Sequence, residues 1–288
     1  MKGFGEKKKT LHQKNISNNN KTIKDQIINK AFTLHSQGNI SEAKKCYENF
    51  INQGFVDHKV FANYGMILIN LGELKKAEIY TRKAIGINPN YAIGYSNLGN
   101  IFQRHGELQK AEVFIRKAIE LDPNFSMAYF NLGNIFQRHG ELQKAEVFIR
   151  KAIELDPNFS MAYFNLGNIR KDLGKTNESL NSFIKVIEIN PQYVYTYNAI
   201  TELLKYADPS QFEATKLKKI LNLLLDKNDV NHRELFRAFN FLYKKDLINS
   251  LEQSENIFSK IKFITHNKPI MNAVEKIIFC DPELEKVL

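Results

Sequence analysis

Residues 97–125 read NLGNIFQRHGELQKAEVFIRKAIELDPNF, and the same letters stand again at 131–159. The identity covers the whole of 97–135, which recurs without a change at 131–169, so the two copies are offset by 34 residues. A period of this length is typical of helix–turn–helix units that stack on their neighbours. Carried outward in the same register, the period gives units that start at Lys24, His58, Ala92, Ser126 and Ser160, with a partial unit from Val194.

The unit that starts at Ala92 predicts two helices that pack as a pair. The inner face of the first helix is apolar or small at four positions: Tyr95, Leu98, Gly99 and Phe102. The pattern breaks at His105-Gly106, and the second helix begins near Glu107 and ends where Pro123 blocks its continuation. The inner face of that helix has the same character: Leu108, Ala111, Ile115 and Ala118. The small residues Gly99 and Ala111 indicate that the paired helices approach closely.

These positions resemble the tetratricopeptide repeat. The aromatic residue that opens the first helix falls at Phe61, Tyr95, Tyr129, Tyr163 and Tyr197. The glycine of the same helix falls at Gly65, Gly99, Gly133 and Gly167. The alanines of the second helix fall at Ala43, Ala77, Ala111 and Ala145, then at Ala84, Ala118 and Ala152. Proline closes units at Pro89, Pro123, Pro157 and Pro191. The resemblance covers residues 24 to about 204 and implies an all-α, right-handed α-solenoid of 34-residue helix–turn–helix repeats.

Departures from the pattern suggest where the repeat array begins and ends. The unit at Lys24 diverges as a terminal cap would, with Ile27, Phe50 and Phe55 at pattern positions. In the unit at Ser160, Ser179 and Val186 replace alanines. The repeat pattern is lost from Thr201 onward, and Asp208-Pro209-Ser210 starts a new segment. We therefore expect a disordered basic tail over 1–23, a solenoid over 24–207 and a C-terminal helical extension over 208–288.

The extension shows helical spacing without the repeat period. Helices are predicted at 211–226, 231–247, 255–265 and 268–279. Asp281-Pro282-Glu283 is a helix start signal close to the last residue, Leu288. It favours a fragment that leads into a further domain, and the alternative is a frayed terminus.

The resemblance implies that the first helices line a concave groove for extended peptides. Asparagines recur there at Asn29, Asn63, Asn97, Asn131 and Asn165. In superhelices resembling those of O-linked N-acetylglucosamine transferases, asparagines so placed grip peptide backbone, because a carboxamide both donates and accepts. The alternative is that they are solvated. A carboxylate clamp is not expected, because the matching positions lack lysine and hold Ile28, Ala62, Ser96, Phe130 and Phe164.

An apolar stripe is predicted beside the asparagines, facing the groove. Its members are Met127, Phe130, Met161, Phe164 and Tyr195. An exposed stripe of this kind usually marks a contact surface. The alternative is that these side chains contact a neighbouring helix or the downstream segment.

Composition and motifs argue against several other functions. The net charge is +10, but residues 1–24 hold seven lysines against one acid, so the body is nearly balanced. Such a tail supports at most weak binding to nucleic acid or anionic lipid. Cys46 and Cys280 lack metal or disulfide spacing, His105 and His139 are turn residues, and no nucleotide-binding or hydrolase motif is present. We expect no cofactor or metal, no membrane span, no secretory signal and a cytoplasmic location.

The sequence therefore predicts a non-catalytic scaffold that binds a protein or an extended peptide. The main alternative is the substrate-presenting arm of a larger glycosyltransferase, sulfotransferase or methyltransferase, since bacterial multidomain proteins resemble this arrangement. A third hypothesis is nucleic-acid binding by the tail. The oligomeric state and the pathway stay open.

Overall fold

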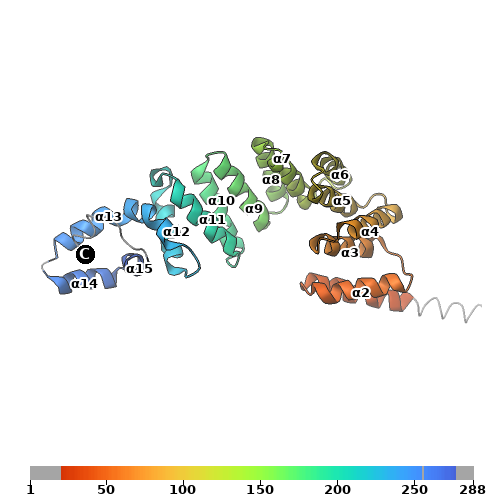
Figure 1. The fold of residues 1–288 in the computed structure, drawn as a ribbon, viewed down its shortest axis with the longest axis horizontal. Coiled ribbons are helices and arrows are strands. Elements are labelled where there is room, and N and C mark those ends of the chain that lie inside the picture. The colour runs from red at the N-terminus through yellow and green to blue at the C-terminus, as the bar shows by residue number, and fades with distance from the viewer. Residues whose placement is uncertain (1–20, 255, 277–288) are drawn as a thin grey trace, which may run out of the picture. The chain divides into compact units, whose positions relative to one another are not determined.

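The computed structural model describes residues 21–254 and 256–276, and within those ranges it consists of helices and turns without a strand (Figure 1). The chain divides into two compact units, Met1–Ile135 and Phe136–Leu288. The division falls within one helix, α7 (Ser126–Arg138). The fold class predicted from the sequence, an all-α helical solenoid, is confirmed.

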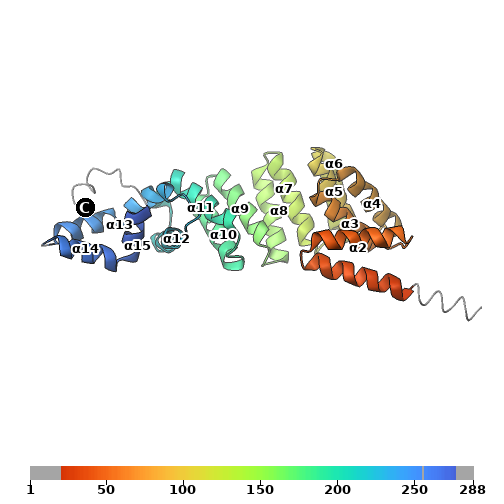
Figure 2. The ribbon, with the colours of Figure 1, turned by 60° about the horizontal axis from the view of Figure 1, so that its bottom comes forward.

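The first unit is built from helix pairs that lie side by side in both views (Figures 1 and 2). A helix over 21–36 precedes α2. The following helices are α2 (Ile40–Asn52), α3 (His58–Asn70), α4 (Leu74–Ile87), α5 (Ala92–Arg104) and α6 (Leu108–Leu121). The period predicted these bounds closely, and α4 and α6 both end two residues before the proline of their unit, at Pro89 and Pro123.

The second unit continues the pairs and adds the extension. Its helices after α7 are α8 (Leu142–Leu155), α9 (Ser160–Asp172), α10 (Thr176–Ile189), α11 (Val194–Tyr206), η1 (Pro209–Gln211), α12 (Ala214–Asp226), η2 (His232–Leu235), α13 (Phe236–Glu252), α14 (Ile257–His266) and α15 (Lys268–Lys276). The helices predicted for the extension are present over the described residues, with short 3₁₀ turns before α12 and α13. Residues 255 and 277–279 of those predictions lie outside the described ranges.

The turn inside each pair requires a glycine. Gly106 has φ of 80°, in the left-handed region that other residues rarely adopt. Its N–H donates to the Gln103 carbonyl at 3.1 Å, and the Glu107 N–H donates to the Phe102 carbonyl at 2.9 Å, which caps the end of α5. Glycines with positive φ recur at the same place in the other pairs: Gly38, Gly72, Gly140 and Gly174.

The close approach predicted for the paired helices is confirmed. A β-carbon added to Gly99 would lie 2.4 Å from the Ile115 side chain and 3.2 Å from the Ala111 carbonyl oxygen. A β-carbon at Gly167 would lie 2.5 Å from the Phe183 ring. Both of the shorter distances are too small for two carbon atoms, so a side chain at either glycine would force its neighbour to move.

One hydrophobic core joins the last repeat helices to the extension. It includes Phe183 of α10, Ile200 of α11, Leu221 of α12 and Phe239 of α13, all fully buried, and it reaches Ala273 of α15. The boundary predicted after residue 207 is therefore not a gap in packing. The extension caps the apolar end of the repeats, which an open solenoid end would otherwise expose to water.

Two sequence predictions fall partly outside the described residues. Residues 21–23 were expected in the disordered tail, but they belong to the helix over 21–36. The rest of that tail, residues 1–20, and the start signal at Asp281-Pro282-Glu283 lie outside the described ranges. Among the helices that are described, none combines the length and apolar character needed to cross a bilayer.

Candidate peptide-binding face

Three side chains of the predicted stripe lie on the surface. Met127 of α7 is 37% exposed, Met161 of α9 is 49% exposed and Tyr195 of α11 is 66% exposed. They are spaced by one repeat in the sequence, so each holds the same place on the first helix of its unit. Exposed apolar side chains that gather on one face are typical of contact surfaces, whereas single ones are common on any protein.

A row of aromatic rings connects Tyr195 to the core of the second unit. Phe183 is fully buried, and the Phe164 ring lies 5.7 Å from it, centroid to centroid. Tyr193 contacts Phe164 edge to face at 5.2 Å, and Tyr195 contacts Tyr193 at 5.5 Å. Tyr195 therefore packs on one side against Tyr193, which contacts the core through Phe164. Burial raises the pKa of the Tyr193 hydroxyl, and Tyr195 beside it adds to that rise.

Tyr193 was missed in the sequence, although a signal for it exists. Four of the five complete repeats end in an aromatic residue at this place, Tyr91, Phe125, Phe159 and Tyr193, and the first ends in Asp57. The recurrence marks a packing position between repeats, and all four of these side chains are half-buried.

Phe130 departs from its predicted place. We expected it to face the groove, but only 5% of it is exposed. Phe164, one repeat later, is half-buried against Phe183 and Tyr193. The alternative stated for the stripe, contact with neighbouring parts of the chain, therefore describes these two phenylalanines better.

Two asparagines of the predicted ladder, Asn97 and Asn131, are buried instead of facing a groove. Asn97 is fully buried, and its Nδ2 donates to the backbone oxygen of Ala62 on α3 at 2.9 Å. Asn131 is 5% exposed, and its Nδ2 donates to Ser96 Oγ on α5 at 3.1 Å. Each amide thus connects the first helix of its 34-residue repeat to the first helix of the preceding repeat. It would have to leave that partner before it could meet a peptide.

The other three asparagines of the ladder are more accessible. Asn29 is exposed, and Asn63 and Asn165 are half-buried. The Asn63 side chain hydrogen-bonds the Tyr47 hydroxyl, whose pKa burial raises to about 12. Of the predicted asparagines, these three retain surface that a ligand could reach.

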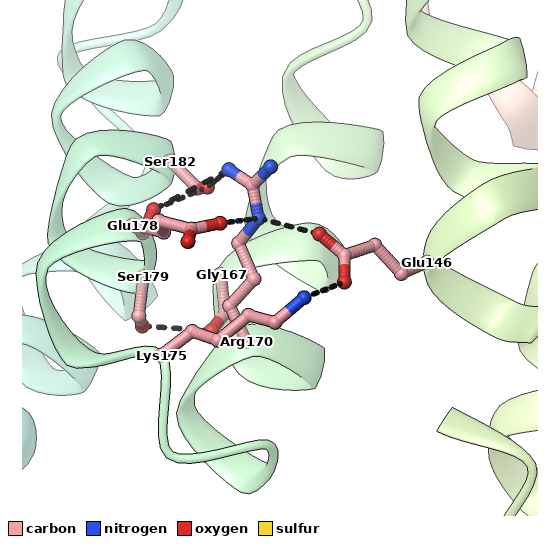
Figure 3. Close-up of polar contacts among 7 residues, drawn as sticks. All are labelled: Glu146, Gly167, Arg170, Lys175, Glu178, Ser179 and Ser182. Carbon is pink, nitrogen blue, oxygen red and sulfur yellow. Dashed lines mark hydrogen bonds and ion pairs between the residues drawn. The ribbon is translucent and has the colours of Figure 1, made fainter. Parts of the chain in front are cut away.

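The most connected polar site is a network in the second unit that the sequence did not reveal (Figure 3). Glu146 of α8 is 7% exposed and accepts a hydrogen bond from Arg170 Nε at 2.9 Å and one from Lys175 Nζ at 2.8 Å. Arg170 also donates to Ser182 Oγ of α10 at 3.0 Å. The network thus binds α8, α9 and α10 together.

The network stands where the regular repeats have stacked rings. Phe102 stacks on Phe114 and Phe136 stacks on Phe148, both at 5.2 Å. One repeat after Phe136 and Phe148 the sequence has Arg170 and Ser182. The simultaneous replacement of both phenylalanines by an arginine and a serine was the sequence signal from which this polar network could have been predicted.

The electrostatics of Glu146 favour its ionised form. Burial alone would raise the pKa of this carboxyl, but the hydrogen bonds from Lys175 and Arg170 outweigh it and hold the pKa below its ordinary value. Each oxygen of this nearly buried carboxylate accepts a hydrogen bond from a cation of a neighbouring segment, so we regard the network as structural.

Nothing in the described ranges gathers three or more residues that could hold a metal ion. His105 and His139 are exposed and follow the last residues of α5 and α7. Their position agrees with the prediction of turn residues.

Comparison with known proteins addresses the family directly. Models of the tetratricopeptide repeat match residues 58–91, 92–125, 126–159 and 148–181. No curated protein is similar enough in sequence to be matched as a relative.

Two solved structures are similar to the chain at low sequence identity. TTC0263, a thermophilic TPR protein in Thermus thermophilus, is 18% identical with a TM-score of 0.57, over 63% of this chain and 98% of that one. PilF of Pseudomonas aeruginosa is 19% identical with a TM-score of 0.53, over 73% of this chain and 97% of that one. Both likenesses concern the fold. The helix pairs, the period and the matched models together identify residues 58–181 as an array of tetratricopeptide repeats.

Proposed function

We propose that the chain is a non-catalytic scaffold that binds an extended segment of another protein. In the second unit the binding surface comprises Met161 on α9 and Tyr195 on α11, with Tyr193 and Phe164 beneath. The repeat family supports a role in protein binding, and the exposure of Met161 and Tyr195 supports this place for it.

The chemistry of these side chains suits a peptide ligand. Tyrosine supplies a large apolar face and a hydroxyl at its tip, and such residues often dominate binding energy at interfaces. Methionine adapts its shape to different ligands. The aromatic row holds Tyr195 in place before the ligand arrives, which lowers the entropic cost of binding.

The test is capture of partners from a lysate on the immobilised full chain, followed by calorimetry with the captured partner. Met161→Ser combined with Tyr195→Ser should weaken binding by roughly 2 kcal/mol or more, because two anchors are lost. Neither side chain is buried, so the melting temperature should stay nearly unchanged. Val113→Ser is the matched control, since Val113 is 66% exposed on the second helix of its pair. Equal affinity of the double variant and the wild type would refute this surface.

A further inference from the structure

A second surface lies between α10, the second helix of the last complete repeat, and α12 of the extension. It is a half-open cavity of about 570 Å³ within the second unit. Four aliphatic side chains line it: Ile184 and Ile187 from α10, and Ile220 and Leu223 from α12. Leu223 is 36% exposed and Ile220 is 4% exposed, so the lining runs from the core to the surface.

The apolar lining reflects a sequence change that the other repeats do not have. Arg82, Arg116 and Arg150 precede Ile184 at intervals of one repeat. In two of those repeats the arginine pairs with a glutamate on the same helix, Glu78–Arg82 and Glu112–Arg116. In the last repeat, leucine replaces that glutamate at Leu180 and isoleucine replaces the arginine. An exposed ion pair has become an aliphatic pair, of which Leu180 is buried and Ile184 faces the cavity.

The spacing of the lining fits another helix. Ile184 and Ile187 are three residues apart on α10, and Ile220 and Leu223 are three residues apart on α12. Side chains three or four residues apart form one ridge of a helix, and two such ridges leave a groove in which a third helix packs. The apolar stripe of an amphipathic helix would cover this lining.

The margin of the cavity carries more positive than negative charge. Lys185, Lys216 and Lys219 line it against a single acid, Glu188. Lys185 pairs with Glu188 at 3.0 Å and Lys216 pairs with Glu213 at 2.9 Å, both at exposed positions. Exposed pairs of this kind contribute little and exchange readily. Lys219 is exposed and forms no ion pair within the described residues.

We propose that this cavity binds an amphipathic helix of a partner protein, with an aliphatic stripe flanked by acidic side chains. The aliphatic stripe covers Ile184, Ile187 and Leu223, and the acids meet Lys219 and the other lysines of the margin. The site is separate from Met161 and Tyr195, so it can hold a partner whether or not that surface binds a peptide.

The test uses two synthetic helical peptides and fluorescence anisotropy with the full chain. Both peptides carry leucine at every third or fourth position. One has glutamates on the flanks, and the other has lysines at the same places. We expect saturable binding of the glutamate peptide, at least tenfold tighter than the lysine peptide, with the difference shrinking as salt rises.

Variants then locate the binding. Ile184→Arg should weaken the glutamate peptide at least tenfold. It should fold normally, since three earlier repeats have arginine there. Lys219→Glu should weaken the glutamate peptide and strengthen the lysine peptide. Tyr195→Ser is the control and should change neither, which separates this site from the proposed peptide-binding face.

Three results would overturn the proposal: no saturable binding of the glutamate peptide, equal binding of both peptides, or full binding by Ile184→Arg. A second copy of the chain is the competing occupant. If Ile184→Arg converted a dimer to a monomer in sedimentation equilibrium, that result would replace the helix proposal with self-association.

Discussion

An ion pair connects the second helix of one repeat to the start of the second helix of the next repeat at two places in the array, which we call the first and the last junction. The two pairs occupy equivalent positions, but the positive and negative residues are exchanged. In the first unit, Lys44 on α2 pairs with Glu73, the residue before α4, at 2.8 Å. In the second unit, Glu146 on α8 pairs with Lys175, the residue before α10, also at 2.8 Å. Counted within the repeats, Lys44 and Glu146 hold one position and Glu73 and Lys175 hold the other. At these two junctions the charges are complementary, in opposite order.

The repeats between these junctions satisfy the same positions differently. They have glutamate at both: Glu78, Glu107, Glu112 and Glu141. Each of these pairs with a cation on or beside its own helix: Arg82, Lys110, Arg116 and Lys144 respectively. Local pairing therefore replaces pairing across a junction where the charges would be alike.

The two junctions differ in depth. The Lys44 and Glu73 side chains are 27% and 30% exposed. At the other junction Lys175 is 42% exposed, but Glu146 is only 9% exposed and also pairs with Arg170, which is 18% exposed. Charges out of water depend more on their partners, because removal of one partner leaves the other desolvated. We therefore expect the Glu146 junction to tolerate substitution far less than the Lys44 junction.

The largest effect is expected for Arg170→Leu. It removes one of the two cations of the buried Glu146 and should destabilise the protein by about 3 kcal/mol. Urea denaturation of the full chain measures the loss. Adding Glu146→Leu should recover part of it, because no buried charge then remains. A double variant less stable than Arg170→Leu alone would contradict this reading of the network.

A smaller effect on stability is expected for alanine substitutions at Gly99 and Gly167, which hold the same position in their repeats. Gly99→Ala would press on the Ile115 side chain, which can rotate away, whereas Gly167→Ala would press on the rigid Phe183 ring. Both should be overpacked, at a cost of about 1–3 kcal/mol, with Gly167→Ala the more costly. Thermal melts of the two variants compare them directly, and a larger loss for Gly99→Ala would show that the ring moves more easily than the aliphatic side chain.

The pH dependence of stability should reveal the contribution of the Glu146 carboxylate. Because the pKa of Glu146 is lowered in the folded state, its contribution is complete at neutral pH. It is lost as pH falls below the ordinary carboxyl value of 4.5 and through the lowered pKa. Glu146→Gln should therefore be less stable at neutral pH and lose less on acidification. Parallel pH profiles for the two proteins would contradict the assignment.

The smallest effect is expected at the first junction. Lys44→Glu should cost about 0.2–1 kcal/mol, since the pair is partly exposed. Adding Glu73→Lys creates the charge order seen at Glu146 and Lys175 and should restore most of the loss. A double variant as unstable as the sum of both single variants would break the equivalence of the two junctions.

The repeat period predicted the helix pairs, their turns and the close contact at Gly99, because these depend on residues within one unit. It failed where a side chain depends on the neighbouring unit. Phe130 and Phe164 have the same local sequence from 126–135 and 160–169, yet Phe130 is buried and Phe164 is half-buried. A period shows which residues are equivalent, but not which neighbours each one meets.

The same reason explains the asparagines and the extension. The sequence predicts that Asn97 and Asn131 face a groove, but their side-chain amides donate hydrogen bonds to the first helix of the preceding repeat. The extension has no period, so its shared core with α10 and α11 could not be derived from register. The exposed residues Met161 and Tyr195 were predictable, because they repeat one position on an outward-facing part of the helix.

Site-specific photo-crosslinking tests the proposed binding face most directly. A photoreactive amino acid replaces Tyr195 in one protein and Val147 in another, both of which are exposed in the second unit. The account predicts that a captured partner crosslinks from position 195, that unlabelled partner peptide competes the crosslink away, and that position 147 yields none. Crosslinks from position 147 alone would place the partner on the second helices and contradict the proposed face.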